Sequence, residues 1–164
     1  MSINAGDKMP SGVFSVMTES GPGAISTDEL FAGKKVVLVS VPGAFTPTCS
    51  MNHLPGYVDH AGEIHKLGVD TIACMAVNDV FVMNAWGKDR KVGDKVVMLA
   101  DGNGEYTRKI GLEMDGTKFG LGQRGQRFAI VVDDGVATHV AVEPPGKFEV
   151  SKAESVLEIL RKSA

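Results

Sequence analysis

Val36-Val-Leu-Val-Ser-Val41, followed directly by Pro42-Gly-Ala-Phe-Thr-Pro-Thr-Cys-Ser50, is the stretch that decides the fold. The first six residues form a continuous, mostly β-branched apolar run, which is typical of a strand buried on both faces of a sheet. This run ends at Pro42-Gly43, and a helix is predicted to begin near Thr46 or Pro47. A buried strand that leads at once into a helix indicates an α/β protein.

The same alternation of strands and helices continues on both sides of this stretch. Ser26 with Glu29 and Ser151 with Glu154 have the spacing of capping boxes, and Asp79 can cap a third helix. The sequence predicts strands over 13–17, 69–77, 95–100, 127–132 and 136–142, and helices over 26–33, 80–88, 105–110 and from 151 onward. The helix after Pro47 is expected to be disturbed at 54–56 and to continue to about residue 67.

The order of these elements predicts one domain over residues 1–164. No internal repeat, low-complexity tract or linker interrupts the chain. Asp133-Asp-Gly135 is a strong hairpin signal between two predicted strands. Strand–helix–strand units followed by a hairpin and a last helix predict a thioredoxin-like fold, with a central mixed β-sheet flanked by helices.

Charge and composition exclude several classes of protein. A net charge of −3 and a pI near 5.8 argue against binding to nucleic acids or anionic membranes. No apolar run is long enough to span a bilayer, and the N-terminus resembles neither a signal peptide nor a transit peptide. We therefore expect a cytoplasmic protein, although an organellar form whose targeting segment has been removed is an open alternative. No set of metal ligands is evident, and no bound cofactor is expected.

Cys49 and Cys74 are the two cysteines, and they form no C-x-x-C pair. Cys49 falls in the first turn of a predicted helix, where free amide N–H groups and the helix dipole favour a thiolate. Thr46 precedes it by three residues, so its hydroxyl is expected to donate to the sulfur or to a bound oxygen. The alternative is that Cys49 is merely a small buried apolar side chain.

A thiolate held in this way is suited to cleaving a peroxide O–O bond. The sulfur attacks one oxygen, negative charge develops on the other, and preorganised donors must stabilise that charge. An arginine is the natural additional donor because it stays charged and presents several N–H groups. The product on the protein is a cysteine sulfenic acid.

Pro42-x-x-x-Thr46-x-x-Cys49 matches the active-site motif of the peroxiredoxins, and the full stretch from Pro42 to Ser50 resembles their type II, or Prx5-like, members. The resemblance implies that Cys49 is the peroxidatic cysteine, Thr46 its hydroxyl partner and Pro42 its shield. It matches Arg127 to the pocket arginine and also implies a homodimer. Further candidates for the pocket are Phe45, His53, Leu121 and Arg124.

Three of these candidates have simpler explanations. Arg124 is the second choice for the pocket arginine, or a solvated loop charge. His53, four residues after Cys49, either shapes the pocket or is a histidine bonded to a neighbour. Leu121 lies in Gly120-Leu-Gly-Gln-Arg-Gly125, which precedes a strand rather than a helix, so this glycine pattern is a close-packed loop and not a nucleotide site.

The reduction of the sulfenic acid is predicted to need an external thiol. Some Prx5-like enzymes carry a resolving cysteine near the start of the last helix, but Gly146-Lys-Phe-Glu-Val-Ser151 has none. Cys74 lies in an apolar run and is expected to be buried. The resemblance favours glutathione with glutaredoxin as the reductant, with thioredoxin as the second choice. The alternative function is a redox-sensing or chaperone-like module without turnover.

Overall fold

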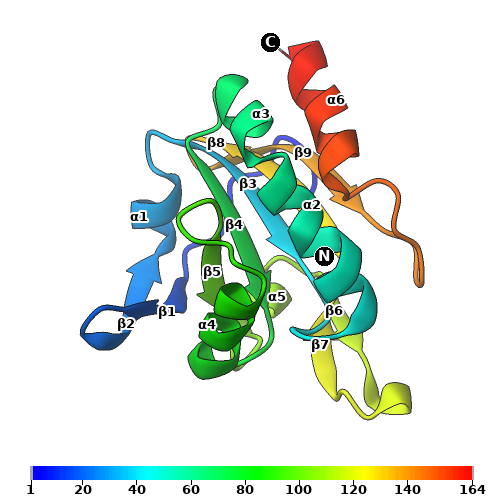
Figure 1. The fold of residues 1–164 in the computed structure, drawn as a ribbon. Helices are drawn as coiled ribbons and strands as arrows, with labels where there is room; N and C mark the ends of the chain where they lie inside the picture. Colours follow the sequence, from blue (N-terminus) through cyan, green and yellow to red (C-terminus); the bar gives the residue numbers. More distant parts are fainter. Residues whose placement is uncertain (1, 164) are drawn as a thin grey trace.

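A mixed β-sheet forms the centre of the molecule (Figure 1). The computed structural model describes residues 2–163, apart from the side chain of Cys49. Its main strands are β1 (Val13–Thr18), β2 (Gly21–Ser26), β3 (Lys35–Ser40), β4 (Thr71–Ala76), β5 (Val97–Ala100), β8 (Phe128–Asp133) and β9 (Val136–Val142). Over the described residues these strands form a seven-stranded sheet in the order β2-β1-β5-β4-β3-β8-β9. The neighbours of β4, which are β3 and β5, run parallel to it, and the other pairs are antiparallel.

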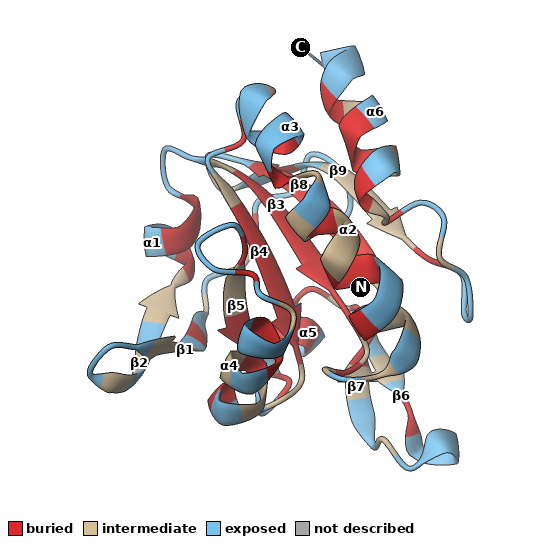
Figure 2. Ribbon diagram, in the orientation of Figure 1, coloured by how far each residue is buried: buried red, intermediate tan, exposed pale blue. Residues whose placement is uncertain are grey.

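Helices cover both faces of this sheet. The helical elements are α1 (Thr27–Phe31), η1 (Cys49–His53), α2 (Leu54–Asp59), α3 (Ala61–Lys66), α4 (Val80–Asp89), α5 (Glu105–Lys109), η2 (Thr117–Phe119) and α6 (Ala153–Ser163). One apolar cluster joins the sheet to α2, α3, α4 and α6, and a second joins its other face to α1 and α5. Successive residues of β3 alternate between the two clusters, which explains why the run is apolar throughout. Figure 2 shows this strand as buried along most of its length.

Several local predictions are confirmed. Val36 to Ser40 are all buried in β3, an interior strand of the sheet between β4 and β8. Ser26 and Glu29 form a reciprocal capping box at the start of α1. Asp134 and Gly135 both have positive φ, 46° and 83°, as a two-residue turn between antiparallel strands requires.

Two predictions are wrong in detail. The last helix begins at Ala153 rather than at Ser151, because the Ser151 hydroxyl donates to Glu143 instead of capping the helix. The helix after Pro47 is disturbed earlier than predicted, by a π-helical turn over Cys49–His53. Strand β2 and the small antiparallel pair β6 (Glu113–Asp115) and β7 (Gln123–Gly125) were not predicted.

Candidate active site

The turn that carries Cys49 follows the C-terminal end of β3, and Arg127 directly precedes the N-terminal end of β8 beside it. Ser40, the last residue of β3, is directly opposite Phe128, the first residue of β8. Because the two strands are antiparallel, Arg127 lies beside the start of the Pro42 turn. The register of two buried strands thus brings together residues that are about eighty positions apart in the sequence.

Backbone contacts hold this turn in place. The Ser50 N–H donates to the Thr46 carbonyl (2.9 Å), so the helix begins where the sequence predicts. The Ala44 N–H donates to Oδ1 of Asn78 (3.0 Å). Phe45 has a φ of 65°, which is costly for a bulky L-residue and persists only where the surroundings determine the backbone.

The π-helical turn at Cys49–His53 has an identifiable cause and a specific support. Pro55 has no N–H, so it cannot donate to the carbonyl of Met51, four residues before it. The Ser50 carbonyl, one residue earlier, accepts from Nη1 of Arg90 (3.0 Å), at the end of α4. Nε1 of the fully buried Trp86 donates to Oγ of Ser50 (2.9 Å). Two side chains of the α4 segment therefore hold the residue that follows Cys49.

The hydroxyl of Thr46 is oriented differently from the prediction. It donates to the Gly43 carbonyl (2.7 Å), and a carbonyl can only accept. Its oxygen can therefore accept a hydrogen bond from a bound hydroperoxide, but its hydrogen is not free for the sulfur.

Arg124 is not a solvated charge. Its Nε donates to the Leu121 carbonyl (2.8 Å) and its Nη1 to the Pro42 carbonyl (3.4 Å). The half-buried side chain links the β7 segment to the Pro42 turn. Arg124 therefore supports the turn through backbone contacts, and the Leu121 carbonyl takes part in that support.

Arg127 is oriented by a buried histidine and an aromatic ring. Its Nη1 donates to Nδ1 of His53 (2.8 Å), and its guanidinium carbon lies 5.8 Å from the centre of the Phe148 ring. His53 is fully buried, and its Nε2 lies 3.1 Å from the Ser151 carbonyl. Since a carbonyl only accepts, Nε2 carries the proton and Nδ1 is free to accept from Arg127.

The same contacts keep His53 neutral. Burial and the charge of Arg127 lower the pKa of His53 to about 3, although the Ser151 carbonyl and Glu143 act in the opposite direction. A protonated His53 would lose its acceptor nitrogen and repel Arg127. His53 is therefore a histidine bonded to its neighbours, and it orients Arg127 through Nδ1.

A cavity of about 410 Å³ opens beside this arrangement. Pro42, Thr48 and Arg127 line it on the side of the Cys49 turn, and the segment from Glu143 to Phe148 lines the other side. None of the four further pocket candidates lines this cavity. Phe45 is half-exposed and Leu121 contributes only its contact with Arg124. Arg124 and His53 instead contact two residues that do line it, Pro42 and Arg127.

Glu143 and Ser151 belong to the site but were not predicted. Oε2 of Glu143 accepts from the N–H and the hydroxyl of Ser151, whose carbonyl faces His53. Burial by itself raises the pKa of Glu143, but the hydrogen bonds from Ser151, Glu149 and Val150 outweigh it and hold the pKa below its usual range. The only local sign of this role in the sequence is that Glu143, a charged residue, directly follows the apolar end of β9.

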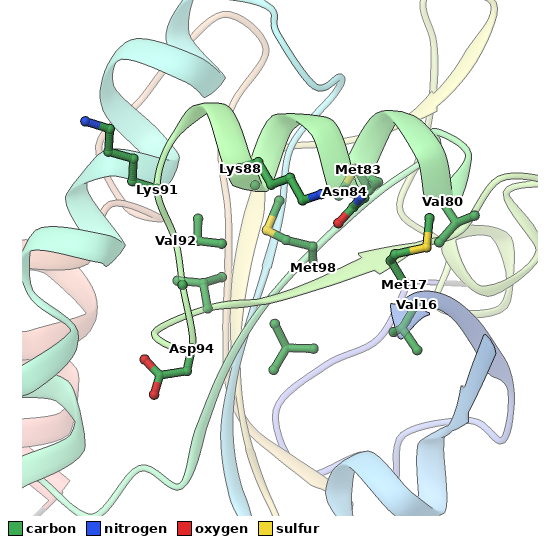
Figure 3. A pocket seen from close by; sticks show the side chains of 14 residues that line it. Val16, Met17, Val80, Met83, Asn84, Lys88, Lys91, Val92, Asp94 and Met98 are labelled. Atoms are coloured by element: carbon green, nitrogen blue, oxygen red, sulfur yellow. The ribbon is translucent and has the colours of Figure 1, made fainter. Parts of the chain in front are cut away.

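A larger hollow lies elsewhere on the molecule (Figure 3). It has a volume of about 650 Å³ and lies between α4, β1 and β5. Its lining is largely aliphatic, with Lys88, Lys91 and Asp94 among its few charged groups. No residue from Pro42 to Ser50 lines it, and neither does Arg127, so this hollow is not part of the site around Cys49.

Among the described residues, no three His, Cys, Asp or Glu side chains lie close enough to hold a metal ion. No helix within residues 2–163 is long and apolar enough to cross a membrane. Cys74 is buried in β4, as predicted.

Comparison with known proteins gives a consistent result. Residues 4–157 match the family model described as Redoxin. Peroxiredoxin-2E, chloroplastic, from Arabidopsis thaliana is 48% identical over 97% of this chain and 70% of its own. Peroxiredoxin-2B from the same plant is 48% identical over 96% of this chain and 98% of its own.

A solved structure extends this result to the fold. Reduced Prx3 from Vibrio vulnificus, in complex with H2O2, is 49% identical over 96% of this chain and 99% of its own, with a TM-score of 0.93. The predicted thioredoxin-like fold, with a mixed sheet flanked by helices, is thereby confirmed.

Proposed function

This chain belongs to the peroxiredoxins, and from that premise we propose that Cys49 reduces hydroperoxides in a one-cysteine cycle that an external thiol completes. Membership of the family makes the chain a thiol peroxidase. The assignment of Cys49, Thr46, Arg127 and Pro42 to their roles is part of the proposal. The observation that carries it is Arg127, held by His53 at the cavity beside the Cys49 turn.

In the peroxidatic step, the thiolate of Cys49 attacks one peroxide oxygen and the O–O bond breaks. The sulfur gains that oxygen as a sulfenic acid, and the other oxygen leaves with the electron pair of the broken bond and takes up a proton to become water or an alcohol. Arg127 stabilises the developing negative charge, and the Thr46 oxygen accepts a hydrogen bond from the peroxide. The V. vulnificus relative in complex with H2O2 supports hydrogen peroxide as one substrate, and alkyl hydroperoxides are the second class.

Two features support an external reductant. The segment from Gly146 to Ser151 contains no cysteine. Cys74 is 1% exposed within the apolar core, where a thiol cannot meet a sulfenic acid without local unfolding. We propose glutathione with glutaredoxin as the reductant, and thioredoxin as the second choice.

We also propose a homodimer. Phe45, Phe81 and Phe119 are 51%, 64% and 76% exposed, which is unusual for large aromatic side chains. The segments that carry them are in contact, since Ala44 bonds to Asn78 and Arg124 bonds to the Pro42 carbonyl. The cytoplasm remains our prediction for the compartment.

A coupled peroxidase assay tests the proposed cycle. With hydrogen peroxide, glutathione and glutaredoxin, we expect many turnovers from the unmodified protein and from Cys74→Ser, and none from Cys49→Ser. Circular dichroism confirms that both variants fold. Loss of turnover in a folded Cys74→Ser variant would contradict the one-cysteine cycle. Stoichiometric oxidation without turnover under glutathione, glutaredoxin and thioredoxin would favour a redox sensor.

A further inference from the structure

Glu143 is connected to Arg127 through the backbone as well as through side chains. Its N–H donates to the Arg127 carbonyl (3.0 Å), where the end of β9 lies beside the start of β8. Its carboxylate oxygen Oε2 accepts from the N–H (2.8 Å) and the hydroxyl (2.7 Å) of Ser151. The Ser151 carbonyl lies against Nε2 of His53, whose Nδ1 accepts from the guanidinium of Arg127. These contacts form a closed ring that holds both ends of Arg127.

The same carboxylate closes the loop that carries Phe148. Oε2 also accepts from the Glu149 N–H (2.7 Å), so three donors from the segment after Glu143 converge on one oxygen. Within this loop, the centre of the Phe148 ring lies 5.1 Å from that of His53 and 5.8 Å from the guanidinium carbon of Arg127. Glu143 is therefore connected to three separate contacts of Arg127, made by its carbonyl, by a histidine and by an aromatic ring.

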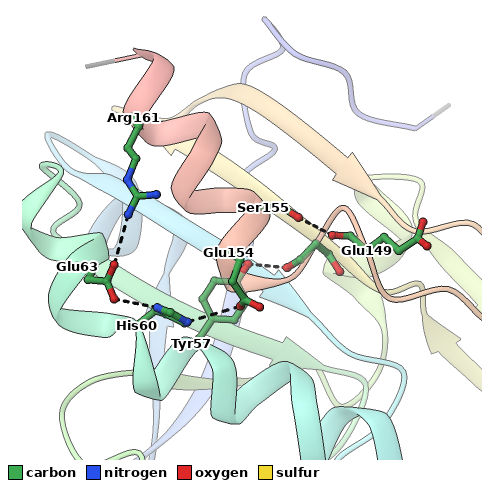
Figure 4. A network of polar contacts seen from close by, with 8 residues as sticks. Tyr57, His60, Glu63, Glu149, Glu154, Ser155 and Arg161 are labelled. Carbon is green, nitrogen blue, oxygen red and sulfur yellow. Dashed lines mark hydrogen bonds and ion pairs between the residues drawn. The ribbon is translucent and has the colours of Figure 1, made fainter.

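The end of this loop also has supports other than Glu143. The Tyr57 hydroxyl donates to the Ser151 carbonyl (2.6 Å), and the Ser155 hydroxyl donates to the Glu149 carbonyl (2.5 Å). Figure 4 shows the contacts of Tyr57 and of Ser155, which tie the segment to α2 and to α6. A substitution at Glu143 should therefore leave the segment attached and change its exact position.

The carboxylate of Glu143 is costly where it stands. Glu143 is only 5% exposed, and its Oε1 is buried with no hydrogen-bond partner among the described residues. A buried acceptor without a donor lowers the stability of the folded protein and is rare in native structures. Departures of this kind from the rules of stable packing are expected at functional sites. A role in the reaction therefore accounts for this carboxylate better than a role in packing alone.

We propose that Glu143 is a positioning residue, which holds the guanidinium of Arg127 at the place where the leaving oxygen of the peroxide becomes negative. It acts through the Ser151–His53 pair and through Phe148. Because the Ser151 carbonyl can only accept, it keeps the proton of His53 on Nε2 and leaves Nδ1 as the acceptor for Arg127. The inference rests on the proposed role of Arg127. Stabilisation of a developing charge depends on the exact place of its donor, so a small displacement of the guanidinium slows the reaction.

A ratio of two rate constants separates positioning from general loosening of the site. The first is for oxidation of Cys49 by hydrogen peroxide, and the second is for its alkylation by iodoacetamide. Both reactions need the thiolate, but only the first develops negative charge on an oxygen beside Arg127. In Glu143→Ala, which leaves three donors without an acceptor, we expect the ratio to fall about tenfold or more. Glu143→Gln keeps an oxygen for these donors and loses the charge, so its ratio should fall less.

Ser151→Ala provides a smaller change at the next position of the ring. It removes the hydroxyl that donates to Glu143 and keeps the N–H and the carbonyl, and we expect the ratio to fall severalfold. Glu158→Gln, at an exposed glutamate on α6, is the matched control and should leave the ratio unchanged. In a His53→Leu background, which lacks the ring between Ser151 and Arg127, Glu143→Gln should cause a smaller further loss than in the unmodified protein.

The outcomes separate this inference from the proposed function. An unchanged ratio in folded Glu143→Gln and Ser151→Ala proteins would overturn the positioning role and leave the roles of Arg127 and Cys49 intact. An undiminished effect of Glu143→Gln in the His53→Leu background would overturn the path through His53. An unchanged ratio in Arg127→Lys would overturn the proposed role of Arg127, and the positioning role of Glu143 with it.

Discussion

At the scale of single residues, the site depends on a histidine that must stay neutral. His53 accepts from Arg127 through Nδ1 (2.8 Å) and approaches the Ser151 carbonyl through Nε2 (3.1 Å). Only the neutral ring can make both contacts at once. The position of Arg127 is therefore linked to the burial of one imidazole.

This burial predicts a specific loss of stability in acid. Because the pKa of folded His53 is lowered from 6.5 to about 3, the unfolded chain takes up a proton first as the pH falls. The stabilisation is complete above about pH 6.5 and is lost progressively toward about pH 3. Between pH 7 and pH 5, His53 should lower the free energy of unfolding by about 2 kcal/mol.

Urea denaturation at both pH values measures this effect. His53→Gln should show a smaller drop between pH 7 and pH 5 than the unmodified protein, because the titrating group is gone. His139→Gln, at a partly exposed histidine on β9, should keep the full drop. An equal drop in all three proteins would show that His53 is not the group responsible.

Some of these residues can be predicted from the sequence and others cannot, for a physical reason. Pro42, Thr46 and Cys49 lie within one turn, so their spacing carries the chemistry and can be interpreted directly. Arg127 was assigned by resemblance. Glu143 and Ser151 reach the site only through tertiary contacts across β9 and the segment after it, and no local pattern marks such residues.

At the scale of elements, the π-helical turn at Cys49–His53 depends on α4. Arg90 donates to the Ser50 carbonyl and Trp86 to the Ser50 hydroxyl, at 3.0 and 2.9 Å. Trp86 is fully buried and belongs to the core. The conformation of the reactive turn is thus determined by a helix about forty residues further along the chain.

Arg90→Gln should loosen this turn. The Ser50 carbonyl would lose its charged donor, which costs about 1 kcal/mol, and Cys49 would be positioned less well. We expect a severalfold lower rate constant for oxidation by hydrogen peroxide in stopped-flow measurements, together with faster amide hydrogen exchange over residues 50–54. Lys88→Gln, at an exposed position of the same helix, should change neither quantity. Unchanged exchange in Arg90→Gln would contradict the assigned role.

The elements that were predicted and those that were missed differ in their local signals. Strand β3 and the Ser26 capping box follow from strong local patterns. Strand β2 begins Gly21-Pro-Gly, which disfavours a strand, and exists because it pairs with β1 along its whole length. The cap expected at Ser151 failed because Glu143 competes for the same hydroxyl.

At the scale of the whole molecule, large apolar side chains remain uncovered near the active-site turn. Phe119 is 76% exposed and Phe45 is 51% exposed. Single exposed apolar residues need no explanation, but several aromatic ones on contacting segments indicate an interface. We therefore expect these side chains to be buried in the proposed homodimer.

Phe119→Ser should weaken that dimer. An exposed aromatic side chain that inserts into an interface is a typical hot spot, and its loss should raise the dimer dissociation constant about tenfold or more. Sedimentation equilibrium measures this constant. Val13→Ser, at a 62% exposed apolar position on β1, serves as the control and should leave the constant unchanged. A monomeric unmodified protein would contradict the proposed interface.

In the proposed cycle, Cys49 is the only cysteine that changes its redox state, and an outside thiol completes each turnover. The most direct test is peptide mass spectrometry after one equivalent of hydrogen peroxide, followed by glutathione and quenching of free thiols. We predict one glutathione attached to the peptide that contains Cys49, with Cys74 still a thiol. A disulfide between Cys49 and Cys74, or an oxidised Cys49 that glutathione leaves unchanged, would contradict the account.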